Sequence, residues 1–172
     1  MRLNSHKKDT DARWAKKNNE THFGYKNHVK CDADSKLITH YAVTNAAVHD
    51  SQRSIVLLDD MDEACYADSA YASKEIVENL PENCKNMICE KGHREKSLSK
   101  EQKESNRLKS KVRCRVEHIF GQMTGQLHGI NIRSIGLIRA WFNIGLLNLV
   151  YNFCRYKFLK STEHLQGTTM PI

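Results

Sequence analysis

Apolar and polar side chains alternate along two stretches between residues 21 and 45, and a short polar segment separates the stretches. The apolar members of the alternation are Phe23, Tyr25, Val29, Leu37, Tyr41 and Val43. A period of two on both sides of a polar turn predicts a β-hairpin. Residues 1–20 are polar and have no periodicity, so we interpret them as a leader without regular structure.

Four short elements are predicted between residues 50 and 92. They are a helix capped by Asp50 or Ser51, a buried strand over residues 64–71 ending near Asp68, a helix over residues 73–80 capped by Ser73, and a strand over residues 85–92 ended by Gly92.

The C-terminal half predicts two longer helices. Residues 97–123 place apolar side chains along one stripe at helical spacing, and residues 137–159 are apolar nearly all round. The most apolar part, residues 140–154, is shorter than the ~18–20 residues that a membrane span needs, so we interpret it as a buried helix and expect no membrane association. The order β-β-α-β-α-β-α-α indicates one mixed α/β domain over residues 21–160, followed by a frayed tail over residues 161–172.

The net charge and the cysteine spacing indicate a binding partner and a cellular compartment. The net charge of +7 and the pI of about 9.1 are typical of nucleic-acid-binding proteins, although an ordinary basic protein has the same balance. The six cysteines contain no C-x-x-C pair, which indicates scattered thiols in a reducing cytoplasm rather than a zinc site. The charged N-terminus is not a signal peptide.

Two acidic residues are candidates for chemistry. Asp68 ends a predicted strand, where active sites of α/β sheets gather, although a turn or cap aspartate has the same position. Glu117 lies on the helix side shared with Ser110 and Arg113, where an ion pair with Arg113 is the alternative. If both carboxylates pack on one sheet, they could share Mg²⁺ or Mn²⁺, and such ions drive phosphodiester chemistry.

Several segments resemble the catalytic domain of bacterial insertion-sequence transposases of the IS-four/IS-five superfamily. They are "DTDARWAKK", "HFGYKNHV", "YAVTNAAVHDS", "ADSAYAS", "SKVRCRVEHIFG" and "RSIGLIRAWFNIGLLNLVYN", and they cover the chain from Asp9 to Leu159. The resemblance implies a ribonuclease-H-like mixed sheet flanked by helices, and an Asp-Asp-Glu triad that holds two Mg²⁺ (or Mn²⁺) ions. It also implies DNA as substrate: transposon ends are cleaved and joined to a target.

The resemblance assigns Asp68 as the second aspartate and Glu117 as the glutamate, both catalytic and metal-binding. A Tyr-Arg-Glu-Lys signature is matched at Arg113 but not at Ser110 or Thr124, which stand where the tyrosine and lysine would be. We expect phosphate contacts from the basic side chains of this helix, unless they form only a solvated face. These candidates for DNA binding are Arg113, Lys109, Lys111 and Arg115.

The family's first aspartate lies on a strand upstream of the segment that contains Asp9 and Asp11, so neither of these is assigned to the triad. We therefore expect an N-terminally truncated domain that lacks its first, central strand and is inactive alone. The alternatives are a catalytically dead DNA-binding or regulatory fragment and one piece of a split transposase. Asp50 is a candidate for the rim of the site or a helix cap, and His49 for a surface residue. The resemblance further implies a homo-oligomer when intact and a bacterial, nucleoid-associated location.

Overall fold

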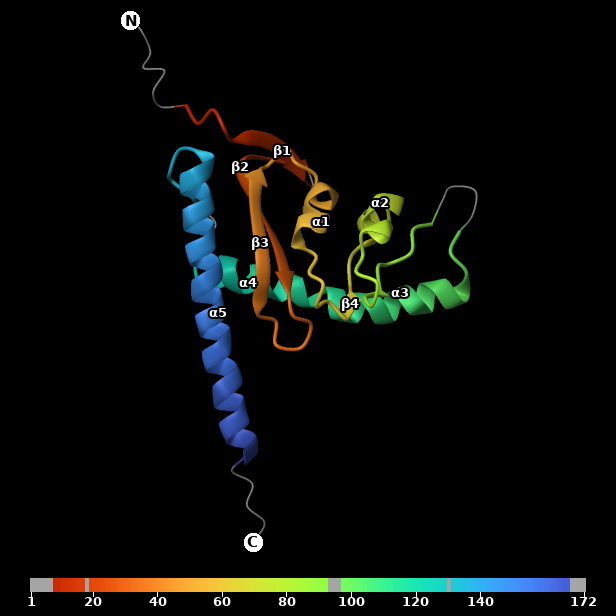
Figure 1. Ribbon diagram of the computed structural model, residues 1–172. Helices are drawn as coiled ribbons and strands as arrows, with labels where there is room; N and C mark the ends of the chain where they lie inside the picture. The colour runs from red at the N-terminus through yellow and green to blue at the C-terminus, as the bar shows by residue number, and fades with distance from the viewer. Residues whose placement is uncertain (1–7, 18, 93–96, 130, 168–172) are drawn as a thin grey trace, which may run out of the picture.

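The computed structural model describes residues 8–17, 19–92, 97–129 and 131–167 (Figure 1). Residues 1–7 of the expected leader and residues 168–172 of the expected tail lie outside this description. Short strands and helices occupy the N-terminal part, and longer helices follow. The strands are β1 (Arg13–Lys17), β2 (Glu20–Cys31), β3 (Ile38–Asn45), β4 (Ala64–Cys65) and β5 (Lys85–Asn86). The helices are η2 (Asp50–Arg53), α1 (Ser54–Leu57), η3 (Ser69–Tyr71), α2 (Lys74–Glu78), α3 (Lys100–Arg113), α4 (Arg115–Gly125) and α5 (Leu137–Gly167).

The predicted hairpin is confirmed. β2 and β3 pair antiparallel from Tyr25 opposite Asn45 to Cys31 opposite Ile38. The turn between them forms because the Asp32 carboxylate accepts a hydrogen bond from the Ser35 backbone N–H at 2.7 Å. β1 pairs with the first part of β2, so the interpretation of residues 1–20 as a leader without structure is wrong where this strand lies. β1 escaped the pattern because its side chains are mostly polar and exposed.

The core lies between the hairpin and the helices α4 and α5 (Figure 1). The side chains buried most deeply there are Ile38, Ile119, Met123 and Tyr151. The Tyr151 hydroxyl donates a hydrogen bond to the Lys36 carbonyl at 3.0 Å, which satisfies its polar end within the core. α5 contacts both β2 and β3 and covers one face of the hairpin along the length of the hairpin.

β4 and β5 form a separate, parallel pair. Backbone hydrogen bonds extend this pairing beyond the strand assignments, because the Cys89 N–H donates to the Ala67 carbonyl at 3.0 Å. The described residues thus form an α/β structure with a small antiparallel sheet and a parallel pair, whereas we expected one mixed sheet. The strands predicted over residues 64–71 and 85–92 are shorter than expected, since η3 begins immediately after Asp68.

Each predicted helix is present with changed limits. Ser99 and Gln102 form a capping box that starts α3, and the helix predicted over residues 97–123 divides at Cys114 into α3 and α4. His49, rather than Asp50 or Ser51, caps η2 by accepting from the Ser51 N–H at 3.3 Å.

α5 continues to Gly167, through seven residues that were expected to fray. It is buried on one side only, so the prediction of a buried helix over residues 140–154 is half correct. None of the helices in the described ranges is long and apolar enough to cross a membrane.

Candidate functional site

Asp68 lies at the end of the β4 segment, as the strand pattern predicts. Its side chain is exposed, and the Ser69 hydroxyl donates to its carboxylate at 3.2 Å. Its backbone carbonyl accepts from the Tyr71 N–H at 2.9 Å, which starts the 3₁₀-helix η3. The side chain does not cap η3, so the carboxylate oxygens remain open to a ligand.

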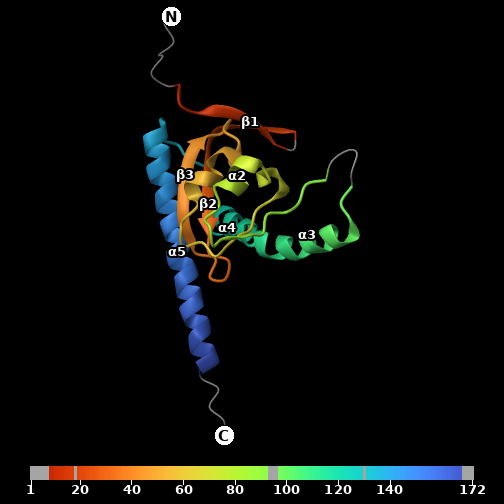
Figure 2. The same ribbon diagram turned by 45° about the vertical axis from the view of Figure 1, so that its right-hand side comes forward.

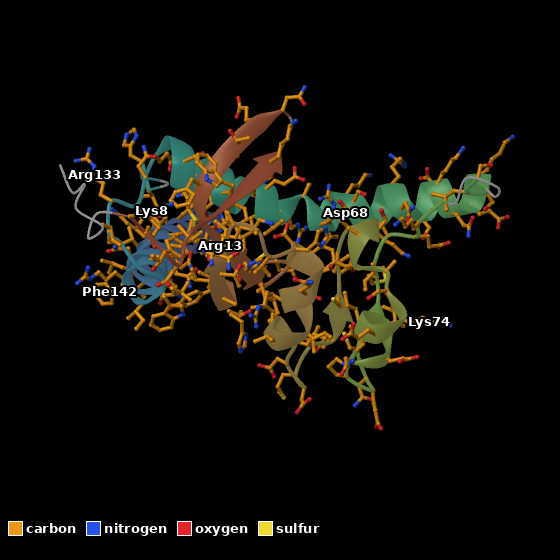
Figure 3. All side chains as sticks on the ribbon, turned by 90° about the horizontal axis from the view of Figure 1, so that it is seen from above. Lys8, Arg13, Asp68, Lys74, Arg133 and Phe142 are labelled. Atoms are coloured by element: carbon orange, nitrogen blue, oxygen red, sulfur yellow. The ribbon has the colours of Figure 1, made fainter. Side chains whose placement is uncertain are left out.

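Hydrogen bonds from the β5 segment fix the end of β4 against α3. The Ala67 carbonyl accepts a hydrogen bond from the Cys89 N–H, and the Cys89 thiol lies 3.7 Å from the Ser110 hydroxyl. The next residue, Glu90, is held in turn, because its backbone exchanges hydrogen bonds with the Asn106 side chain. Seen from above, Asp68 lies along the line of α3 and α4 (Figure 3). Ala67, the residue before Asp68, is thus linked through Cys89 to Ser110 on α3.

Glu117 is on the same side of the helix pair as Ser110. Helical geometry stacks Ser110, Arg113 and Glu117, because they are separated by three and four residues and the backbone stays helical through Cys114. An Arg113 guanidinium nitrogen lies 3.1 Å from a carboxylate oxygen of Glu117, which is the alternative interaction expected for this residue. Among the described residues, no hydrogen bond joins Asp68 to Glu117: the Asp68 carboxylate accepts from Ser69, and the Glu117 carboxylate pairs with Arg113.

The four basic candidates on this helix pair differ in what they contact. Lys109 is 13% exposed and donates to the Ile88 carbonyl, so it ties α3 to the segment after β5. Arg115 donates to the Ala33 carbonyl and pairs with Asp34 in the hairpin turn. Arg113 pairs with Glu117, and Lys111 is exposed. Two of the four therefore have structural contacts, and Arg113 and Lys111 remain the better positioned for phosphate.

Tyr71 lies close to the charges of Asp50 and Asp68, a neighbour that the sequence did not predict for these two residues. Burial, together with the nearby charges of Asp50 and Asp68, raises the pKa of Tyr71 to about 12. Asp50 also lies 3.4 Å from the side-chain nitrogens of Lys26 and His28 on β2. These neighbours are compatible with the predicted position of Asp50 at the rim of the site. The residue that caps η2 is His49 and not Asp50.

Asp9 and Asp11, which were not assigned to the triad, connect the N-terminal segment to α5. Asp9 accepts from the Tyr25 hydroxyl at 2.8 Å and from the Gly136 N–H at 3.1 Å. Partial desolvation acts to raise the pKa of Asp9, but these hydrogen bonds outweigh it and lower the pKa. Asp11 accepts from the Leu137 N–H at 2.9 Å, at the first turn of α5. Both carboxylates thus have structural roles.

The donor chemistry at Asp68 and Glu117 fits a hard divalent cation. Both are exposed carboxylates, and Mg²⁺ prefers one or two carboxylates with several retained waters. Within the described ranges, no group of three or more His, Cys, Asp or Glu side chains could hold a metal ion. Asp68 and Glu117 could therefore supply only two of the ligands of such an ion, and water would have to supply the others.

Comparison with known families identifies the class of protein. The sequence profile of the family described as "Transposase DDE domain" matches residues 1–153. The chain belongs to this family, as the sequence motifs indicated.

A relative narrows the match to insertion sequences. The chain is 33% identical over 136 residues to a protein described as the transposase for insertion sequence element IS1106 from Neisseria meningitidis serogroup B. The matched segment covers 77% of this chain and 47% of that protein, so the chain spans about half the length of this curated relative. No solved structure gives a significant match.

Proposed function

We propose that this chain carries part of the active site of a DNA transposase, with Asp68 and Glu117 as metal-binding carboxylates of an Asp-Asp-Glu triad in a ribonuclease-H-like domain. The observation that carries the proposal is the contact between Cys89 and Ser110. It holds the end of the β4 segment, next to Asp68, against the helix side that carries Glu117. The proposed substrate is DNA, namely the transposon ends and their target in the bacterial nucleoid. The proposed assembly is a homo-oligomer.

A divalent ion, Mg²⁺ or Mn²⁺, would supply activation of water or of a 3′-hydroxyl and stabilisation of the leaving oxygen. Asp68 would bind it from the sheet side and Glu117 from the helix side. Arg113 now neutralises Glu117 at 3.1 Å. The planar fork of the Arg113 guanidinium is also suited to a DNA phosphate, and Arg113 would contact one beside Glu117.

The positive charge of the chain supports DNA binding. The net charge of +7 favours attachment to the phosphate backbone. Lys111 is exposed one turn before Arg115, and Arg113 lies two residues further along than Lys111, about 200° around the helix. Lys111 and Arg113 would therefore contact the DNA backbone from two sides of the helix, with Arg113 on the side of Glu117.

Iron-directed cleavage of the polypeptide tests whether the two carboxylates share one ion. Fe²⁺ replaces Mg²⁺ at carboxylate sites, and with ascorbate and peroxide it cleaves the backbone beside its ligands. We expect cuts near residues 68 and 117 together, and we expect Asp68→Asn to remove both. The matched control is Asp60→Asn, which removes a carboxylate from the preceding acidic loop and should leave both cuts. A cut near one residue without the other, or the loss of only one cut in Asp68→Asn, would refute the shared site.

A further inference from the structure

α5 has two apolar sides, and only one of them is covered. The inner side packs on the hairpin through Ala140, Ile144, Leu147 and Tyr151. The opposite side carries large apolar residues that are between 49% and 65% exposed. They are Phe142, Leu146, Leu149, Phe153 and Tyr156, which we call the outer seam. A helix that is apolar on both sides is normally buried on both.

The outer seam has the spacing of a coiled-coil interface. Its residues follow one another at intervals of four, three, four and three, which is the a/d pattern of a heptad repeat. Figures 1 and 2 both place α5 at the edge of the molecule, with the hairpin on one side and no other described element on the opposite side. The seam can therefore receive another helix without rearrangement of the fold.

We propose that the outer seam pairs with the outer seam of a second copy of this chain, with the two α5 helices antiparallel. The area is sufficient. A fully buried aromatic side chain covers ~150–250 Å², so a seam of this size at these exposures offers roughly 500–600 Å² per copy. Ile138 and Val150 flank the seam and are also exposed. With them, two copies would bury about 1,300 Å², within the range of stable interfaces.

Charge selects the antiparallel orientation. The C-terminal part of the seam is flanked by Arg155, Lys157 and Lys160, and two of these cations stack on the rings of Phe158 and Tyr156. A parallel pair would bring these cations against their own copies, and like charges repel. In an antiparallel pair these cations instead lie opposite the other end of the partner's seam, near Phe142, where Arg139 is the one basic residue of the first two turns of α5. Heptad layering then sets Leu149 opposite Phe153 of the second copy.

The proposal refines the homo-oligomer of the proposed function and rests on it only in that respect. Its test uses neither DNA nor metal, so a failure here leaves the proposed metal site untouched. Sedimentation equilibrium of the full chain should show a monomer–dimer equilibrium. Leu149→Glu and Phe153→Glu should each weaken the dimer at least ~10-fold, because each buries a charge at the centre of the interface. Both side chains are half exposed, and circular dichroism verifies that each variant folds.

The control is Met61→Glu, an exposed apolar residue (86%) in the loop between α1 and β4, which should leave dimerisation unchanged. A chain that stays monomeric up to about 100 µM overturns the proposal, because its association would then be weaker than roughly −5.5 kcal/mol. So does a dimer insensitive to both seam variants. Monomeric chain that binds phosphatidylglycerol vesicles through Leu149 would assign the seam to lipid and also overturn it.

Oxidative cross-linking tests the orientation on a Cys154→Ser background, which removes the exposed native thiol. Leu149→Cys combined with Phe153→Cys should give a covalent dimer. Phe142→Cys alone should not, because a rise of 1.5 Å per residue separates the two copies of that position by ~27 Å in the antiparallel pair. A covalent dimer through position 142 would refute the antiparallel arrangement.

Discussion

Glu117→Gln separates metal binding from ion pairing at the candidate site. The substitution keeps the shape of the side chain and removes its charge, together with the contact to Arg113 at 3.1 Å. The carboxylate is 60% exposed, and an exposed pair separated by four helical residues contributes only about 0.3–0.5 kcal/mol. We therefore expect almost no loss of stability. If Glu117 is one of two carboxylates on an ion, Mn²⁺ affinity should instead fall at least ~10-fold, or about 1.4 kcal/mol.

Titration of Mn²⁺ followed by electron paramagnetic resonance measures this affinity, and urea unfolding measures stability. Glu104→Gln is the matched control, because Glu104 also forms an exposed helical pair, with an Arg107 nitrogen at 2.6 Å. Both substitutions remove one negative charge and one arginine contact from the same pair of helices. Equal Mn²⁺ affinity in the two variants would mean that Glu117 serves only as an ion-pair residue.

Three further predictions concern DNA binding, the core and pH. Lys111→Gln should reduce the slope of log affinity for duplex DNA against log salt by about 1, measured by fluorescence anisotropy, and an unchanged slope contradicts a phosphate contact. Lys109 is half-buried and bonded to Ile88, so Lys109→Gln should instead lower the melting temperature. Ile119→Ala should cost about 2–4 kcal/mol in urea unfolding and Leu108→Ala less than about 0.5, because only the first is buried, and equal losses would disprove this core assignment. Burial lowers the pKa of His28, so the unfolded chain binds that proton more tightly; the free energy of unfolding should fall as pH drops below about 6.5, and His28→Gln should flatten this dependence.

The elements of the fold were predictable where one periodicity dominated. The hairpin has a clear alternation and a turn, and its strands lie where the pattern predicts. The division at Cys114 was not predictable, because the apolar stripe continues across it and the residue keeps a helical conformation. β1 was missed for the opposite reason. Its pairing with β2 is a backbone interaction, and its mostly exposed side chains have no reason to alternate.

The candidate site was predictable as residues and not as contacts. Strand position and helical spacing made Asp68 and Glu117 candidates, and the family resemblance assigned them to the site. The structure has Asp68 after β4 and Glu117 in the first turn of α4. The pairing of Arg113 with Glu117 also followed from spacing. The tie from Cys89 to Ser110 could not be foreseen, because it depends on the register of a two-residue parallel strand pair. Tertiary pairing of such short strands leaves no periodic signal in the sequence.

An ion pair between Lys30 and Asp62 joins the segment before Asp68 to the hairpin, and this leads to a last prediction. One face of β2 carries Lys26, His28 and Lys30, since alternate residues of a strand share a face. Lys30 donates to both Asp62 oxygens at 2.9 and 3.0 Å, and both side chains are only about one-fifth exposed. Asp62 belongs to the loop that leads into β4, so this pair fixes the approach to Asp68.

Lys30→Met should therefore cost about 1–3 kcal/mol in urea unfolding, because it leaves the half-buried Asp62 carboxylate without its cation. The same substitution should weaken Mn²⁺ binding at Asp68, which it does not touch, by loosening the loop that positions it. Arg107→Met removes an exposed ion pair on α3 and should change neither the stability nor the Mn²⁺ affinity. If Lys30→Met were no more destabilising than Arg107→Met, solvent would already screen the Lys30–Asp62 pair, and another contact would have to hold this loop on the hairpin.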